Sequence, residues 1–352
     1  MSKVVIKIGS NLLVDRDGEI NKKYIAELCR EVSQVFMAGN NVVLVTSGSK
    51  AAGYGYLKEK INKSDLYIKQ ALCSAGQIQI VKIYENVFDL YNIKVAQILL
   101  TRDDFSDRKR FLNFRNTMIG LTQMKIIPII NENDTIATEE IKFGDNDILA
   151  SMFAIGWAAD YLILLTSCDG VIAEDGSLIK EYHEGINLKV FNSTSWGSGG
   201  ITSKINAAHN ASKNGVRACI CNGKKFENIN GFLSTGYAGT VFLPEEQPKA
   251  RKSWIGFLTK SKGKIYLNKG AERALKTGKS VLAIGIMNVT GSFNEGDIVD
   301  IFIENKPIGR GIINFSSKEL ELIKGLKSNQ IENRLGHSCS KVVMHTDNIQ
   351  IK

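Results

Sequence analysis

Several short segments of the chain carry residue types that bind anions or move charge, and each adjoins an apolar run. In the first, "KIGS", Lys7 lies inside a run rich in Val and Ile, and Gly9 begins a tight turn. A lysine on a buried strand is costly unless its ammonium group reaches an anionic partner. We therefore predict that Lys7 contacts a bound ligand rather than having a structural role in the core.

Two later segments combine small hydroxyl residues with amides and carboxylates. "TSGSKAAG" places Ser47 where small neighbours let a ligand approach the backbone and where the next helix would open. Taken alone, this segment fits an ordinary strand-to-helix turn equally well. Further on, "NENDTIATEEIKFGDNDILA" places Asp134, Asn146 and Asp147 near predicted element ends, where turn formers and helix caps also occur. Two such clusters close together indicate side chains that grip an ammonium group and position lysines.

The segment "STSWGSGGITSK", Ser193 to Lys204, fits either a flexible linker or a phosphate-binding loop. Its spacing is not G-x-x-x-x-G-K-[ST], which excludes a Walker loop. A segment of helical period follows directly, so the glycines precede a helix N-terminus, with Thr202 or Ser203 as the cap and Lys204 in the first turn. Backbone donors, the helix dipole and one ammonium group would converge on an anion. This favours the phosphate-binding loop.

The elements that must position these residues follow from the alternation of apolar runs and helical segments. Continuous runs rich in Val and Ile are typical of strands buried on both faces, and they occur at 4–9, 42–48, 93–100, 126–131, 161–167 and 216–221. Helices are expected at 22–38, 64–91 and 111–124. The order predicts an α/β fold, an αβα sandwich with a mostly parallel central sheet. Ligands collect at the carboxyl ends of the strands of such a sheet.

The last third of the chain has a different pattern. Residues 246–258 hold a charge cluster next to two of the four prolines, and we interpret this segment as a linker between a first domain, 1–245, and a second, 259–352. In the second, short β-rich runs separated by Gly, Asn and Asp, with a helix at 270–276, predict a small β-barrel-like domain.

Composition and charge limit the class of protein. With 352 residues and 43% hydrophobic content, the chain is expected to form two domains. It contains no run of about 18 apolar residues and no signal peptide, so a soluble cytoplasmic protein without membrane contact is expected. The six cysteines form no C-x-x-C pair and are interpreted as reduced thiols.

The net charge of +9 is concentrated in the tail. Residues 250–352 hold 17 Lys and Arg against 9 Asp and Glu, which leaves +1 for the rest of the chain. Such a charge is typical of nucleic-acid binding or of a lysine-rich solvated surface. The absence of a clustered basic run with interleaved aromatic residues favours the second interpretation.

The segments "KIGS", "TSGSKAAG", "INENDTIATEEIKFGDND", "LLTSCDG" and "GSGGITSK" resemble, in order and spacing, the amino acid kinase family. The tail resembles a PUA domain, so the resemblance covers nearly the whole chain and implies the amino acid kinase fold plus a small β-rich PUA-like domain. Aspartokinases and acetylglutamate kinases usually carry a double glycine after the first lysine, whereas this chain has one. That difference favours the members of the family that phosphorylate glutamate.

The resemblance implies roles for individual residues. Lys7 and Lys204 would contact the transferring phosphoryl group, and Asp147 would orient both lysines. Glutamate would be bound by Ser47, Asp134 and Asn146. ATP would lie against Lys7, Gly9, Thr166, Ser167, Ser198, Gly199, Gly200, Ile201, Thr202, Ser203 and Lys204. Relatives often have Asp where this chain has Ser167, so a neutral hydroxyl replaces a carboxylate at this position.

The implied reaction is transfer of phosphate from ATP to the side-chain carboxylate of L-glutamate, the first step of proline biosynthesis. Mg²⁺ would be held mainly by nucleotide phosphates and water, with no dedicated protein site. The resemblance also implies a homodimer or homotetramer, feedback inhibition by proline and functional coupling to glutamate-5-semialdehyde dehydrogenase. Two alternatives remain: an amino acid kinase acting on N-acetylglutamate, aspartate or another acidic substrate, and RNA binding by the PUA-like domain, although nucleic acid is not the expected partner.

Overall fold

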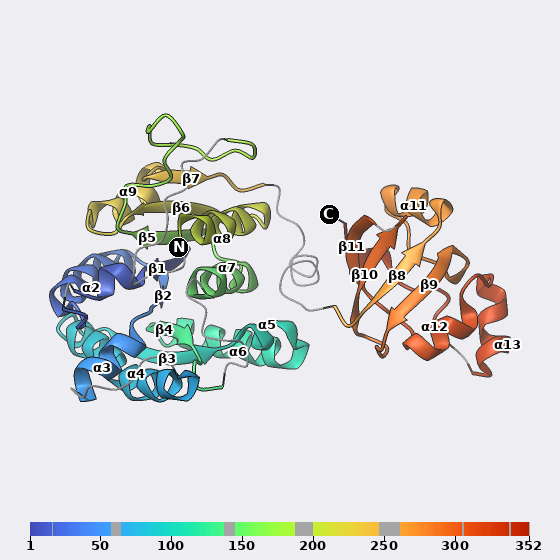
Figure 1. Cartoon of the computed structure of the whole chain (residues 1–352), viewed down its shortest axis with the longest axis horizontal. Coiled ribbons are helices and arrows are strands. Elements are labelled where there is room, and N and C mark those ends of the chain that lie inside the picture. The colour runs from blue at the N-terminus through green and yellow to red at the C-terminus, as the bar shows by residue number, and fades with distance from the viewer. Residues whose placement is uncertain are drawn as a thin grey trace. The chain divides into compact units, whose positions relative to one another are not determined.

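The computed structural model describes residues 1–15, 17–57, 65–136, 145–186, 200–245, 261–304, 306–337 and 339–351. The chain divides into two compact units, Met1–Gln247 and Pro248–Lys352, each built around one sheet (Figure 1). The linker predicted at 246–258 lies outside the described residues.

The first unit contains a seven-stranded sheet with the order β3-β4-β2-β1-β5-β6-β7. Neighbouring strands are parallel except that β7 runs antiparallel to β6. The strands are β1 (Lys3–Ile8), β2 (Asn41–Val45), β3 (Lys94–Leu100), β4 (Ile126–Glu132), β5 (Tyr161–Thr166), β6 (Arg217–Asn222) and β7 (Thr240–Phe242). All six predicted strands are present, and the predicted α/β fold with a mostly parallel sheet is confirmed.

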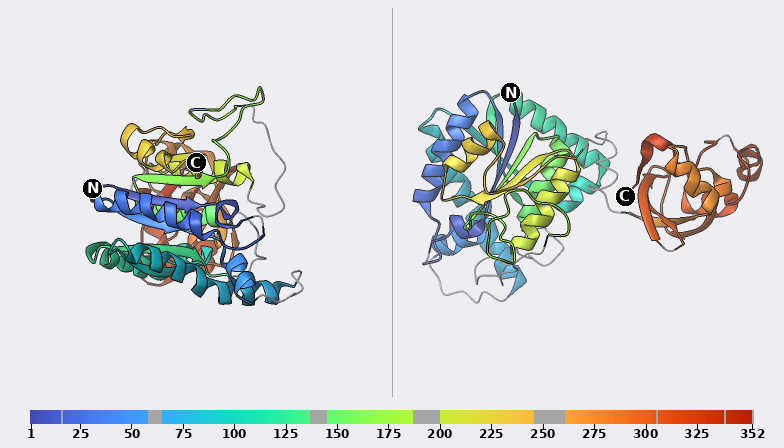
Figure 2. Two further views of the ribbon diagram at one scale, coloured as in Figure 1. Left: turned by 90° about the vertical axis from the view of Figure 1, so that its left-hand side faces the viewer. Right: turned by 90° about the horizontal axis from the view of Figure 1, so that it is seen from above.

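Helices cover both faces of this sheet. On one face α2 packs between α4 and α9, and on the other α7 packs between α6 and α8 (Figure 1). The helices are α1 (Ser10–Leu13), α2 (Lys22–Met37), α3 (Ser49–Leu57), α4 (Leu66–Asp89), α5 (Arg102–Ser106), α6 (Arg108–Gln123), α7 (Asp145–Trp157), α8 (Ile201–Lys213) and α9 (Glu227–Thr235). Both views of Figure 2 mark the N-terminus at the start of β1, so the loops that follow the parallel strands gather at the opposite edge.

Helices α3 and α4 cross at two glycines. A methyl group at Gly53 would meet the backbone of Leu72, and one at Gly76 would meet the backbone of Ser49. Because neither glycine has a side chain, the two helix backbones touch directly. This contact fixes the first turn of α3, which follows β2, against the middle of α4.

The second unit has a mixed five-stranded sheet with the order β12-β11-β10-β8-β9. Its strands are β8 (Gly263–Leu267), β9 (Ile286–Gly291), β10 (Ile298–Ile303), β11 (Lys306–Ile312) and β12 (Ile349–Ile351). Its helices are α11 (Lys269–Lys276), α12 (Ser317–Ile323) and α13 (Ile331–Leu335), with 3-10 turns at Ala283–Gly285, Ser328–Gln330 and Thr346–Asn348. The helix predicted at 270–276 is confirmed as α11, whereas α12 and α13 were not predicted.

Each unit has a core of its own. In the first, the buried faces of β1 and β2 pack against α2 and α4 around Ile6, Leu28, Leu44 and Tyr84. In the second, Ile265, Val299 and Phe315 belong to a separate buried cluster. Among the described residues, no helix has both the length and the apolar content needed to span a membrane.

Candidate functional site

A buried group of three charged residues lies where β1 meets the helices that cover it. Lys7 Nζ, from β1, is 2.5 Å from Asp147 Oδ1, and Lys204 Nζ, from α8, donates a hydrogen bond to Asp147 Oδ2 at 3.1 Å. Asp147 stands in the first turn of α7 and is fully buried, while the two lysines are less than a tenth exposed. The structure therefore brings together the three residues that the sequence assigns to catalysis.

Burial and charge act against each other at this site. Burial lowers the pKa of Lys7 below its ordinary value, although Asp147 opposes the shift and Lys204 adds to it. Burial alone would raise the pKa of Asp147, but the two ammonium groups outweigh burial and hold that pKa below its usual range. Two ammonium groups against one carboxylate leave excess positive charge in a buried place, and such a centre favours an anionic ligand.

The residues predicted to bind glutamate follow β2 and β4 and begin α7. Asn146 Nδ2 lies 2.8 Å from the Thr46 carbonyl oxygen, 2.9 Å from Ser47 Oγ and 3.0 Å from Asn131 Oδ1. The Ser47 and Asn146 side chains are thus in direct contact. Asp134 lies beside the start of α3, where Ser49 Oγ donates to its Oδ2 at 3.2 Å. The structure groups these side chains at the carboxyl edge of neighbouring strands.

Two consecutive residues of α7 connect the polar side chains that follow β2 and β4 with the charged triad. Asn146 contacts the ends of β2 and β4, whereas Asp147 contacts β1 and α8. The first turn of α7 therefore carries one side chain for the polar group and one for the triad.

Gln77 belongs to this site and was missed from the sequence. Its side chain is only 7% exposed, and its Oε1 accepts a hydrogen bond from Asn131 Nδ2 at 2.7 Å. It lies in the middle of α4, far from any recognised segment. The sequence could have revealed Gln77 as a polar residue on the helix face of Cys73, Ile80 and Tyr84, which packs against the core.

The residues predicted to bind ATP lie at the ends of β1 and β5 and at the start of α8. Gly9 N–H donates to the Leu165 carbonyl at 3.1 Å, so the turn after β1 lies directly against β5. Thr166, which ends β5, is buried, whereas Ser167 is exposed. Ser198 and Gly199 lie outside the described residues.

The predicted cap of α8 is wrong. The helix begins at Ile201, and Gly200 occupies the N-cap position. Thr202 and Ser203 therefore lie inside the first turn, where the Ser203 N–H donates to the Gly200 carbonyl at 3.0 Å. The helix starts earlier than expected because the backbone of Gly200, rather than a hydroxyl side chain, closes the first turn. The start of α8 still presents backbone N–H groups and the positive end of its dipole.

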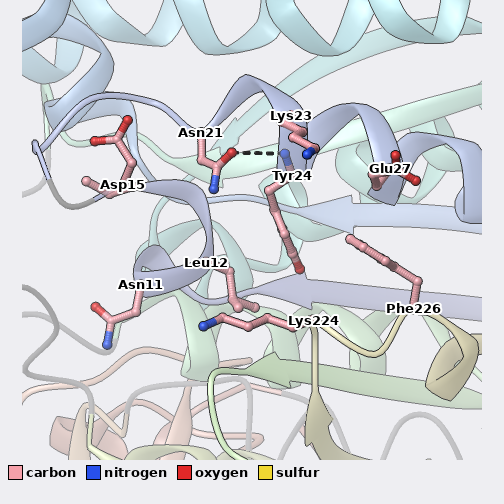
Figure 3. Close-up of a pocket in the computed structure, with 10 residues that line it drawn as sticks. Asn11, Leu12, Asp15, Asn21, Lys23, Tyr24, Glu27, Lys224 and Phe226 are labelled. Carbon is pink, nitrogen blue, oxygen red and sulfur yellow. Dashed lines mark hydrogen bonds between the residues drawn. The ribbon is translucent and has the colours of Figure 1, made fainter.

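A cavity of about 630 Å³ lies in the first unit beside α1 and the start of α2 (Figure 3). The rings of Tyr24 and Phe226 lie 5.4 Å apart on its wall, and Lys224 and Asp15 contribute opposite charges. Its lining includes neither the charged triad nor any other residue predicted to bind ATP or glutamate. The cavity and the triad are therefore separate features.

The described residues contain no group of three or more His, Cys, Asp or Glu side chains placed to hold a metal ion. At the triad itself, each oxygen of Asp147 already faces a lysine. This arrangement suits an anion better than a directly coordinated cation.

Comparison with known proteins decides the family. Residues 2–222 match the model of the amino acid kinase family, and residues 263–335 match the PUA domain. The chain belongs to the amino acid kinase family. The resemblance inferred from the five segments is thereby confirmed, and so are the amino acid kinase fold of the first unit and the PUA domain of the second.

Within the amino acid kinase family, the chain groups with proteins named glutamate 5-kinase. It is 57% identical to glutamate 5-kinase of Kosmotoga olearia, with 99% of each chain covered. The protein of that name from Thermotoga maritima is 53% identical, again with 99% of each chain covered. The one from Caldanaerobacter subterraneus subsp. tengcongensis is 40% identical, covering 99% of this chain and 97% of that protein.

Proposed function

We propose that the chain transfers phosphate from ATP to the side-chain carboxylate of L-glutamate and so forms glutamyl 5-phosphate, the first step of proline biosynthesis. The observation that carries this proposal is the buried triad, in which Lys7 and Lys204 are both held on Asp147. Full-length similarity to glutamate 5-kinases supports the choice of substrate.

The chemistry calls for charge neutralisation rather than proton removal. A glutamate side chain has a pKa of about 4 and is already an anion at neutral pH, so it attacks phosphorus without a general base. The obstacle is repulsion between this carboxylate and the phosphate oxygens. Lys7 and Lys204 stabilise the charge on the transferring phosphoryl group, and the N-terminus of α8 adds backbone donors. Asp147 keeps both ammonium groups directed to one place.

The substrate half of the site recognises an amino acid by its charged ends. Ser47 and Asn146 offer a hydroxyl and an amide to the bound glutamate, and Asp134 supplies a negative charge for its ammonium group. Because Asn146 precedes Asp147 on α7, glutamate binds next to the phosphoryl-binding lysines.

The nucleotide half runs from the turn after β1 to the start of α8. We assign ATP binding to Lys7, Gly9, Thr166, Ser167, Ser198, Gly199, Gly200, Ile201, Thr202, Ser203 and Lys204. The closeness of Gly9 to β5 and the glycine cap of α8 support the described part of this set.

Mg²⁺ enters with the nucleotide in this proposal. The triad lacks a carboxylate oxygen that does not already face a lysine, so the ion is held by phosphate oxygens and water. When bound, it neutralises charge on the phosphates, and the residues of the chain do the positioning.

Residues 1–245 carry catalysis in this proposal, and residues 259–352 act as an accessory or assembly domain. We further propose a homodimer or homotetramer, inhibition by proline, and functional coupling to the dehydrogenase that consumes the acyl phosphate. Sedimentation of the full chain and inhibition curves with proline test the first two of these assignments.

The deciding experiment measures ADP release from ATP and Mg²⁺ with L-glutamate, L-aspartate or N-acetylglutamate as acceptor. Hydroxylamine in the assay traps an acyl phosphate as its hydroxamate. We expect hydroxamate to form with L-glutamate in preference to the other two acceptors. ADP release without hydroxamate, or a preference for another acceptor, would overturn the proposal.

A further inference from the structure

Three side-chain amides form a chain from α4 to the substrate half of the site. The orientation of the middle amide is fixed, because Asn131 Oδ1 accepts a hydrogen bond from the backbone N–H of Glu132 at 2.9 Å. Asn131 Nδ2 must then face Gln77, whose Oε1 accepts from it at 2.7 Å. The acceptor of Gln77 therefore adds a second hydrogen bond that holds Asn131 in this orientation.

The last amide of the chain is fixed in the same way. Asn146 Nδ2 lies within hydrogen-bond distance of the Thr46 carbonyl and of Asn131 Oδ1, both of which only accept. The Asn146 carbonyl oxygen must then point elsewhere. This Oδ1 atom is buried and has no hydrogen-bond partner among the described residues. A buried acceptor without a donor is costly, and the cost disappears when a ligand supplies one.

Gln77 is held in place by the backbone and not only by its hydrogen bond. It follows Gly76, at which α4 touches α3 without an intervening side chain. Its own Nε2 is also buried without a partner among the described residues. An apolar residue would avoid that cost, so packing alone does not account for a glutamine here.

We propose that Gln77 is a positioning residue for the amino acid substrate. It holds Asn131 together with the backbone N–H of Glu132, and Asn131 in turn holds the Asn146 amide together with the Thr46 carbonyl. In this orientation Asn146 Oδ1 accepts a hydrogen bond from the α-ammonium group of bound glutamate. The inference rests on the proposed function, and it deepens it by assigning recognition of the ammonium group to an amide chain that begins on α4 as well as to Asp134.

The test replaces Gln77 with methionine, which has a similar length but lacks the acceptor. Losing one hydrogen bond to the ammonium group raises the KM for L-glutamate about 3- to 10-fold. Neither kcat nor the KM for ATP changes by more than about twofold, because the triad is untouched. Gln79→Met, a half-buried position on the same helix, is the matched control and keeps the wild-type KM.

Glutarate, which is glutamate without its ammonium group, distinguishes this role from general damage to the site. Its inhibition constant against L-glutamate stays unchanged in Gln77→Met, because the lost bond is one that glutarate never makes. An equal loss for glutarate and glutamate, or unchanged saturation by glutamate, overturns the inference.

Gln77→Glu keeps an oxygen that accepts from Asn131 and recovers most of the affinity lost in Gln77→Met. Equal impairment of both variants, with thermal unfolding like the wild type, rules against the acceptor role. If the wild-type protein forms no hydroxamate from L-glutamate, the proposed function fails instead, so the two failures are distinct.

Discussion

The substitution Asp147→Asn removes the charge that holds two lysines in one buried place. Asp147 lies 2.5 Å from Lys7 Nζ and 3.1 Å from Lys204 Nζ. Asparagine keeps the shape of the side chain, but it replaces one acceptor oxygen with an N–H group that faces an ammonium group. The lysines then lose both their partner and their alignment.

The size of the effect follows from these two contacts. A hydrogen bond between charged groups contributes about 1.5–3 kcal/mol. If the alignment of one lysine in the transition state depends on it, kcat falls about 10- to 150-fold. With both lysines affected, we expect a loss of at least about 100-fold. Breaking a buried ion pair also costs about 3–5 kcal/mol of stability, a large part of the roughly 5–15 kcal/mol of a typical domain, so urea unfolding of the variant must show that it is folded.

The same substitution shifts the pH dependence in a defined direction. Asp147 raises the pKa of Lys7 against the effect of burial, so its removal lowers that pKa further. Lys7 then loses its proton at a lower pH, and the alkaline limb of the kcat profile moves toward neutrality. For stability, the depressed pKa of Asp147 contributes at pH values above its ordinary value of 3.8 and is lost as pH falls through the folded-state pKa.

Rates of ADP release across pH, together with urea unfolding, measure these effects. Asp160→Asn is the control, since this exposed carboxylate accepts the backbone N–H of Lys3 and takes no part in the triad. A kcat for Asp147→Asn within about threefold of wild type, with an unshifted alkaline limb, would refute the assigned role of the carboxylate.

Four further substitutions test other parts of the molecule. Lys204→Ala lowers kcat at least about tenfold with a smaller change in the KM for glutamate. A wild-type turnover rate would contradict the assigned contact between Lys204 and the phosphoryl group. Asp134→Ala and Ser47→Ala raise the KM for glutamate in initial-rate assays at saturating ATP, whereas unchanged saturation would argue against both assignments. Gly76→Ala forces a methyl group into the backbone of α3 and lowers the free energy of unfolding in urea by about 1–3 kcal/mol. Gly120→Ala, where the space is open, does not, and equal losses would contradict the close crossing.

The six parallel strands of the first sheet were predictable because each is a largely apolar run. Lys7 could be recognised for the opposite reason, since a charged side chain inside such a run is costly in a core without a partner. Asp147 was noticed only as part of a polar cluster before an apolar helix. The family resemblance then supplied roles that spacing alone left open, as at Ser47, where a turn and a site looked alike.

Features that depend on contacts between distant segments were not predictable. Gln77 lies 54 residues from Asn131 in the chain, and only the packing of α4 in the folded first unit brings the two together. The start of α8 was misplaced because a glycine cap acts through its backbone and leaves no side-chain signal. The same limit applies to β7, whose antiparallel pairing with β6 depends on the fold of the whole sheet.

The adjacency of Asn146 and Asp147 has a consequence for how rate and selectivity are related. Neighbouring Cα atoms are about 3.8 Å apart, so in the proposed assignment one peptide unit sets the spacing between the backbone of the residue that binds glutamate and that of the residue that aligns the two lysines. In this proposal the first turn of α7 therefore contributes to the effective molarity of the two reactants. Substitutions at the ends of β2 and β4 can then alter which acid is bound, while the spacing between Asn146 and Asp147 stays the same.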